Sequence, residues 1–142
     1  MKPIWKKKYP IKYKTEYIDD NAEDILKIIL EGFDAWNKGI DDYKVWVTNN
    51  YDSTANSSSL DERDRTRDEY IKEIEELCNN NEIKKKYFDN ILIRGNWAAL
   101  HYRYTREPKP LTGENIYVGD RMQFLKFEEK NGVLKIANSW IQ

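Results

Sequence analysis

The spacing of apolar residues changes midway along the chain, and this change constrains the fold more than any other feature. Over residues 20–80 apolar side chains recur every three or four positions, as on helices. From residue 86 onward they alternate with polar side chains, as on half-buried strands. Helices followed by an antiparallel meander predict an α+β fold with the helices against one face of a sheet.

Two long helices and a shorter one are predicted in the first half. The first begins after Asp20 or Asn21 and ends before Gly39. A shorter helix follows over residues 41–50, with Val45 and Trp46 inside, and the polar residues 51–61 are expected to form a loop, with or without a short strand. The second long helix lies within residues 61–81 and ends at a run of asparagines. The predicted buried stripes are Ile25, Ile28, Ile29, Phe33 and Trp36 on the first helix and Tyr70, Ile71, Ile74 and Leu77 on the last.

Two hairpins are predicted in the second half, around Gly95-Asn96 and Asn131-Gly132. Paired residues share a side of the sheet, so each turn assigns the faces of its strands. The first turn pairs Asp89 with Tyr102 and places His101, the only histidine, on the opposite face. The predicted covered face is Asp89, Ile91, Ile93, Ala98, Leu100, Tyr102 and Tyr104 in this hairpin, and Gln123, Leu125, Phe127, Leu134, Ile136, Asn138 and Trp140 in the last.

Charge and cysteine content exclude several classes of function. The net charge is −1 with both signs interspersed, so no basic field favours nucleic acid. No apolar run is long enough to span a membrane, and no secretory signal is seen, so we expect a cytoplasmic protein. The single cysteine, Cys78, excludes an internal disulfide and a cysteine-rich metal site, and no cofactor is expected. Residues 1–20 are predicted to be a basic tail or extension, and residues 21–142 the domain.

Three stretches carry a resemblance to a known superfamily. They are "FDAWNKG" at the end of the first long helix, "IRGNWAALHYRYT" as a central strand pair, and "KNGVLKIANSW" as the final hairpin. In order and spacing they resemble the nuclear transport factor 2-like superfamily, in its SnoaL-like polyketide cyclase branch. The resemblance covers residues 21–142. It implies a cone-shaped roll, with the N-terminal helices packed in the concave face of a curved antiparallel sheet around an apolar cavity.

The usual catalytic residues of this superfamily are not matched. In SnoaL-like cyclases an acid–base Asp precedes the closing Trp and a His lies in the preceding strand; the matching positions are Ser139 and Gln123. The positions matching the Tyr, carboxylate base and buried acid of ketosteroid isomerases are Gly32, Asn56 and Gln123. An amide or a hydroxyl does not exchange protons near neutral pH, so neither mechanism transfers directly.

The candidate catalytic residues are therefore Asp89 and Tyr102. A carboxylate desolvated against aromatic rings has a raised pKa and can act as a base, although Asp89 at the strand entrance could equally be hydrated. Gln123 and Asn138 could orient a ligand or bond to each other. An aromatic lining could stack on a flat ligand or be plain core. The predicted ligand-binding residues are Phe33, Trp36, Leu100, Tyr104, Gln123, Asn138 and Trp140, with no metal ligands.

We therefore expect a domain that binds a small apolar or aromatic molecule in an aromatic-lined cavity. One alternative is an isomerase, dehydratase or cyclase that uses Asp89 as its acid–base group; another is a non-catalytic protein-interaction domain. The superfamily commonly dimerises through the outer sheet face. Here that face is predicted to present Trp97, His101, Arg103 and Phe124, so a homodimer is expected.

Overall fold

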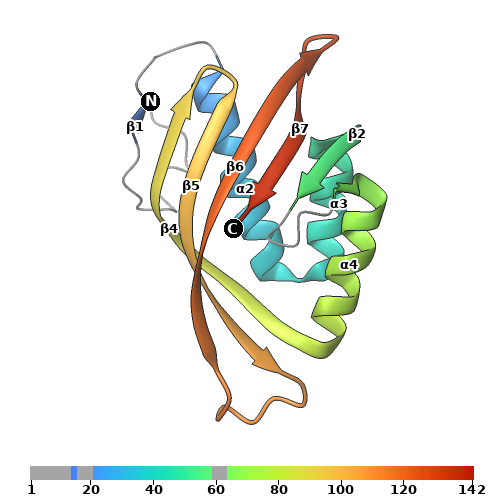
Figure 1. Ribbon diagram of the computed structural model, residues 1–142, viewed down its shortest axis with the longest axis vertical. Coiled ribbons are helices and arrows are strands. Elements are labelled where there is room, and N and C mark those ends of the chain that lie inside the picture. The colour runs from blue at the N-terminus through green and yellow to red at the C-terminus, as the bar shows by residue number, and fades with distance from the viewer. Residues whose placement is uncertain (1–13, 16–20, 59–63) are drawn as a thin grey trace.

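The protein is a strongly curled sheet with three helices packed in its concave side (Figure 1). The computed structural model describes residues 14–15, 21–58 and 64–142. Most of the predicted N-terminal tail, residues 1–20, lies outside the described residues. The α+β prediction is confirmed, with helices covering one sheet face as expected.

The three helices form one layer. They are α2 (Ala22–Lys38), α3 (Ile40–Asn50) and α4 (Arg67–Asn80). Only Gly39 separates α2 from α3, and its φ of 147° suits a residue without a side chain. The start of α4 is fixed by a capping box, in which the Thr66 hydroxyl accepts from the Glu69 amide and the Glu69 carboxylate accepts from the Thr66 amide.

Within the described residues the sheet has seven strands, in the order β1-β4-β5-β6-β7-β2-β3. The central antiparallel meander is β4 (Asn81–Arg94), β5 (Trp97–Pro108), β6 (Tyr117–Lys130) and β7 (Val133–Ile141). At its edges β1 (Lys14–Thr15) and β2 (Tyr51–Ser58) are added in parallel, and β3 (Arg65–Thr66) pairs with β2. The sheet is thus mixed rather than purely antiparallel, and residues 51–58, expected as loop with an optional strand, form one.

The core lies between the helices and the inner face of the meander. Four members of the predicted α2 stripe are buried, and Ile28 is half-buried. In α3 the buried residues are Tyr43 and Val47; Val45 is 60% exposed, so the prediction that it lies inside is wrong. The short helix turns its face toward α2 through Tyr43 and Val47, which are four residues apart.

Irregularities in the strand pairing decide which residues face inward. Around the first turn the ladder runs as predicted from Arg94–Trp97 to Asn90–His101, but it shifts by one residue between Phe88 and Asn90. Phe88, not Asp89, is therefore paired with Tyr102, and a second shift lies between Lys85 and Phe88. A bulge inserts an extra residue and reverses the alternation beyond it.

Candidate functional site

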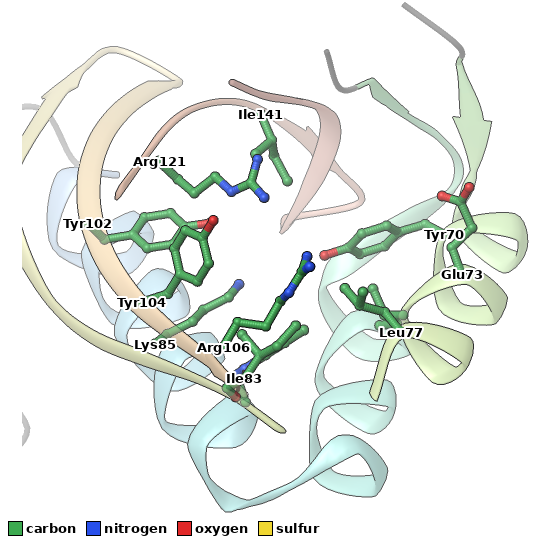
Figure 2. Close-up of a pocket in the computed structure, with 12 residues that line it drawn as sticks. Tyr70, Glu73, Leu77, Ile83, Lys85, Tyr102, Tyr104, Arg106, Arg121 and Ile141 are labelled. Carbon is green, nitrogen blue, oxygen red and sulfur yellow. Dashed lines mark hydrogen bonds between the residues drawn. The ribbon is translucent and has the colours of Figure 1, made fainter. Parts of the chain in front are cut away.

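A pocket of about 420 Å³ lies between α4 and the inner face of β4, β5 and β6 (Figure 2). Its inner wall is formed by buried side chains, among them Trp36 and Tyr102, whereas Leu77 and Arg106 are exposed and mark its solvent side. The walls are mainly aromatic and aliphatic, from Trp36 of α2, Tyr70, Ile74 and Leu77 of α4, Ile83 of β4, Tyr102 and Tyr104 of β5 and Ile141 of β7.

Cross-strand rows explain why these side chains meet. Arg121 of β6 is opposite Tyr102, and Lys85 and Gly119 flank Tyr104 in the next row. Residues directly opposite one another project from the same face, so each row delivers its side chains to the pocket. Gly119 leaves room for the Tyr104 ring: a Cβ atom at this position would lie 2.7 Å from Tyr104 Cζ.

Lys85 is enclosed by aromatic rings at the sheet side of the pocket. Its Nζ atom lies 4.4 Å from the centroid of the Trp36 ring and 5.2–5.3 Å from those of three further rings. Burial, and next the charge of Arg121, lower the pKa of Lys85 from 10.5 to about 7, while Cys78 opposes the shift. Near neutral pH this amine is partly unprotonated. The three further rings are those of Phe33, Tyr43 and Tyr102.

Two arginines add positive charge to the same pocket. Arg121 holds its guanidinium carbon 5.1 Å from the centroid of the Tyr104 ring, and Arg106 extends toward α4 (Figure 2). The one carboxylate among the described lining residues, Glu73, forms an ion pair with Arg65 outside the pocket. The lining therefore carries an excess of positive charge in an otherwise apolar space. Such a site favours an anion.

A row of buried hydrogen-bonding groups lies behind the pocket. The Gln123 amide nitrogen donates to the Ser139 hydroxyl over 3.0 Å, and the Tyr43 and Tyr70 hydroxyls are 2.8 Å apart. The Tyr51 hydroxyl lies between the two pairs: hydrogen bonds to Ser139 and Tyr70 lower its pKa, but burial is the larger effect and raises that pKa to about 12. These hydroxyls remain protonated near neutral pH.

Within the described ranges no group of three or more His, Cys, Asp or Glu side chains could hold a metal ion. None of the helices within those ranges is sufficiently long and apolar to cross a membrane.

Comparison with solved structures identifies the fold. No protein-family model matches the sequence, and no curated protein matches it. A candidate polyketide cyclase from Xanthomonas campestris is similar in structure, with a TM-score of 0.69 and 11% identity over 86% of this chain and 91% of that one. A candidate SnoaL-like polyketide cyclase from Jannaschia has a TM-score of 0.68 and 13% identity over 89% and 90% of the two chains. The chain adopts the NTF2-like fold.

A further NTF2-like protein, from Burkholderia pseudomallei and of unknown function, gives a TM-score of 0.67 at 12% identity over 82% of this chain and 88% of that one. The expected superfamily resemblance is thus confirmed at the level of fold. In this NTF2-like fold, the positions that the resemblance assigned to an acid–base pair are Gln123 and Ser139, and they are hydrogen-bonded to each other.

Three of the predicted site residues line the pocket: Trp36, Tyr102 and Tyr104. Phe33 and Gln123 instead line a much smaller inner space of about 20 Å³, which Lys85 also touches. Leu100 is 1% exposed and belongs to the core. The predicted lining is therefore divided between the pocket and the core behind it.

Asn138 and Trp140 do not lie on the covered face, and the register predicted for them is wrong. The ladder between β6 and β7 shifts between Lys126 and Phe127, so Asn138 pairs with Lys126 and Trp140 with Phe124. Ser139 takes the inward position and is completely buried. Ala137 is the extra residue of this bulge, and it reverses the faces of everything after Ile136.

The predicted pairing of Asp89 with Tyr102 is also wrong, because Phe88 occupies that position. The side chain of Asp89 lies outside the described residues, and its role stays a prediction. His101 is on the outer face as expected, where its Nε2 atom lies 2.8 Å from Asp120 Oδ2. The hydrogen bond from His101 is the main cause of a lowered Asp120 pKa.

The basic residues of the pocket were missed by sequence reasoning. Arg121 lies two residues before Gln123 and Arg106 two after Tyr104, so alternation alone would have placed both on the covered face. Lys85 lies four residues before Asp89, so alternation would also have placed it on the covered face, but opposite Arg106; the two irregularities in β4 bring it opposite Tyr104 instead.

Proposed function

We propose that this protein binds a small, largely apolar or aromatic molecule with an anionic group in the pocket between α4 and the sheet. The observation that carries the proposal is the convergence of Lys85, Arg106 and Arg121 on an aromatic-walled space whose one described carboxylate is paired elsewhere. Tyr102, Tyr104 and Trp36 would contact the apolar part of the ligand. Arg121, from the inner part of β6, would bind the anionic group of the ligand.

The fold comparisons support a small-molecule role but do not specify the ligand. Among the similar structures are candidate polyketide cyclases, whose names imply polyketide substrates. One fold serves many functions, so the proposal rests on the pocket rather than on those names.

Calorimetry with a panel of aromatic carboxylates, from benzoate to 2-naphthoate, tests the proposal when each acid is compared with its neutral amide. We expect the acids to bind more tightly, and Arg121→Gln to abolish the preference by removing the charge that meets the carboxylate. Arg94→Gln, an exposed position beside the β4–β5 turn, serves as the matched control and should leave affinity unchanged. Equal binding of acids and amides across the panel would refute an anionic ligand.

The catalytic role predicted for Asp89 with Tyr102 remains a hypothesis about this same site. A turnover assay with Asp89→Asn tests it once a substrate is known: retained turnover in a folded variant would remove the acid–base mechanism that depends on Asp89.

We also propose that two copies associate through the outer sheet face. The support is an outer aromatic patch, defined as Trp97, Met122, Phe124 and Trp140, which are 36–49% exposed. The Trp97 and Trp140 rings stack at 5.8 Å, and His101 and Arg103 lie on the same outer face. A second copy would present the same surface. Sedimentation analysis should give a dimer that Phe124→Glu dissociates and Leu111→Glu, in an exposed loop, does not; a wild-type monomer at all concentrations would disprove it.

A further inference from the structure

The position of Lys85 suggests chemistry beyond binding. Its Nζ atom is the basic group nearest the aromatic floor of the pocket, whereas Arg121 and Arg106 reach in from two other strands (Figure 2). No carboxylate among the described residues pairs with this amine. If an arginine binds the anionic end of a ligand, the other end of that ligand would therefore face the Lys85 amine, which has no carboxylate partner among the described residues.

We propose that Lys85 is a nucleophilic lysine that forms an imine with a carbonyl-bearing anion bound in this pocket. The inference rests on the proposed binding function and adds a substrate class to it, namely aldehydes or ketones that also carry a carboxylate. Three features of the site support it: the protonation state of the amine, the four aromatic rings around it, and the separate anchors for the anion.

An amine must be unprotonated to attack a carbonyl. Burial and the neighbouring charge of Arg121 lower the pKa of Lys85 to about 7. At pH 7 roughly half of the Lys85 side chains are then neutral, on the order of a thousand times the neutral fraction of a surface lysine. Desolvation in an apolar pocket and a neighbouring cation are the two known ways in which proteins activate a lysine. Lys85 has both.

The chemical step balances without a further reactant. The nitrogen lone pair forms a C–N bond to the carbonyl carbon, and the C=O π electrons move to oxygen, which gains a proton; the amine loses one. The hydroxyl of the carbinolamine then takes up a proton and leaves as water when its C–O bond breaks; the nitrogen lone pair forms the C=N bond, and the second N–H proton is released in place of the one taken up. Tyr102, whose raised pKa keeps its hydroxyl protonated, lines the same pocket as Lys85 and would donate to the carbonyl oxygen.

Reductive trapping of the full-length protein tests the inference. The protein is incubated with 4-formylbenzoate and cyanoborohydride, which reduces the imine to a stable amine, and the adduct is located by peptide mass spectrometry. We expect one adduct, at Lys85, that forms faster with 4-formylbenzoate than with the neutral 4-formylbenzamide. Lys85→Arg should lose the adduct, whereas Lys84→Arg, at the exposed neighbouring lysine, should retain it. Adducts spread over surface lysines and unchanged in Lys85→Arg would overturn the proposal.

The pH dependence of trapping gives a second test that needs no variant. The labelling rate at Lys85 should be half-maximal near pH 7, while surface lysines should react only at much higher pH. A profile that rises only toward pH 10 would overturn the proposal. The groups that face Lys85 from the packed elements are Phe33 and Trp36 of α2, Tyr43 of α3, Cys78 of α4, Tyr102 and Tyr104 of β5 and Arg121 of β6.

A binding measurement with 4-methylbenzoate, which has no carbonyl to attack, separates this inference from the function on which it rests. If 4-methylbenzoate binds but 4-formylbenzoate gives no adduct at Lys85, the nucleophilic role of Lys85 is refuted and the binding proposal is retained. An adduct at Lys85 that forms equally fast with the neutral aldehyde would support the nucleophile and refute the anionic ligand. If 4-methylbenzoate does not bind and 4-formylbenzoate gives no adduct, both the binding proposal and the nucleophilic lysine are refuted.

Discussion

The ammonium nitrogen of Lys85 lies 4.4 Å from the centroid of the Trp36 ring, within a cage of four aromatic side chains. The rings attract the charged form, whereas burial and Arg121 disfavour it. The second effect is larger, because the pKa of Lys85 falls to about 7. The site thus holds a lysine whose charge responds to small changes in its surroundings.

Lys85→Met should raise stability most at acidic pH. Between about pH 7 and 10.5 the unfolded chain binds a proton at Lys85 that the folded protein has lost, so wild-type stability rises with pH in this window. Below pH 7 the folded protein carries the disfavoured charge. Urea unfolding should therefore show a higher midpoint for Lys85→Met at pH 6, with the gap closing toward pH 10. Lys84→Met is the control; a gap independent of pH would contradict the lowered pKa.

Gly119→Ala should weaken ligand binding without unfolding the protein. The new Cβ atom would lie 2.7 Å from the Tyr104 ring and from Tyr117 Cε1, so the half-buried Tyr104 ring, a wall of the pocket, would have to shift. We expect the affinity for 2-naphthoate to fall about fivefold, or ~1 kcal/mol, with little change in Tm. Val118→Ala, at an exposed neighbour on β6, should change neither quantity, and an unaltered affinity in Gly119→Ala would argue against Tyr104 as a pocket wall.

Gly32→Ala should destabilise the protein although alanine favours helices. Helix propensity would contribute about 1 kcal/mol in its favour. The Cβ atom, however, would lie 2.5 Å from Trp46 Cζ2, and this indole is held by a hydrogen bond to the Ile28 carbonyl and by stacking on Tyr43. Overpacking costs about 1–3 kcal/mol, so we expect a net loss in unfolding free energy. The sign should reverse in a Trp46→Leu background, where the clash is absent; if it does not, the contact is not the cause.

Tyr70→Phe should cost more stability than Tyr43→Phe. Both hydroxyls are buried and bonded to each other, but Tyr70 also bonds to Tyr51, so removing its hydroxyl deprives two partners. An unsatisfied buried hydroxyl costs about 1–3 kcal/mol. Urea unfolding of both single variants and the double variant forms a double-mutant cycle, in which the double variant should lose less than the sum. Additive losses would show that the two hydroxyls act independently.

Much of the architecture could be predicted from the sequence, because it depends on periodicity and turn chemistry. The α2 stripe and the Gly95-Asn96 and Asn131-Gly132 turns defined the helices, the hairpins and the outer position of His101. Prediction failed where the backbone departs from strict alternation. Neither the shifts that bring Phe88 to Tyr102 and Lys85 to Tyr104, nor the bulge after Ile136, has a marker in the residues themselves.

The candidate site was predicted less well than the fold, and the reason is physical. A fold tolerates an extra residue in a strand, because the strand accommodates it by bending and twisting locally. A binding site does not, because it depends on which face of the sheet each side chain occupies. Arg121 could have been found by alternation from Gln123. Lys85 could have been placed on the covered face in the same way, but its cross-strand partner could not, because two extra residues in β4 replace Arg106 with Tyr104.

The bulge at Ala137 determines which residues at the end of β7 face the interior. If Ala137 paired across the ladder instead of bulging out, the alternation would be unbroken and the last stretch would turn over, exchanging the small hydroxyl of Ser139 for the indole of Trp140 beside Gln123. The core would then be overpacked, and the outer face would lose Trp140, which stacks on Trp97 there. Deleting Ala137 should instead keep Ser139 opposite Leu125 and Trp140 outside, because the remaining residues then alternate without a bulge.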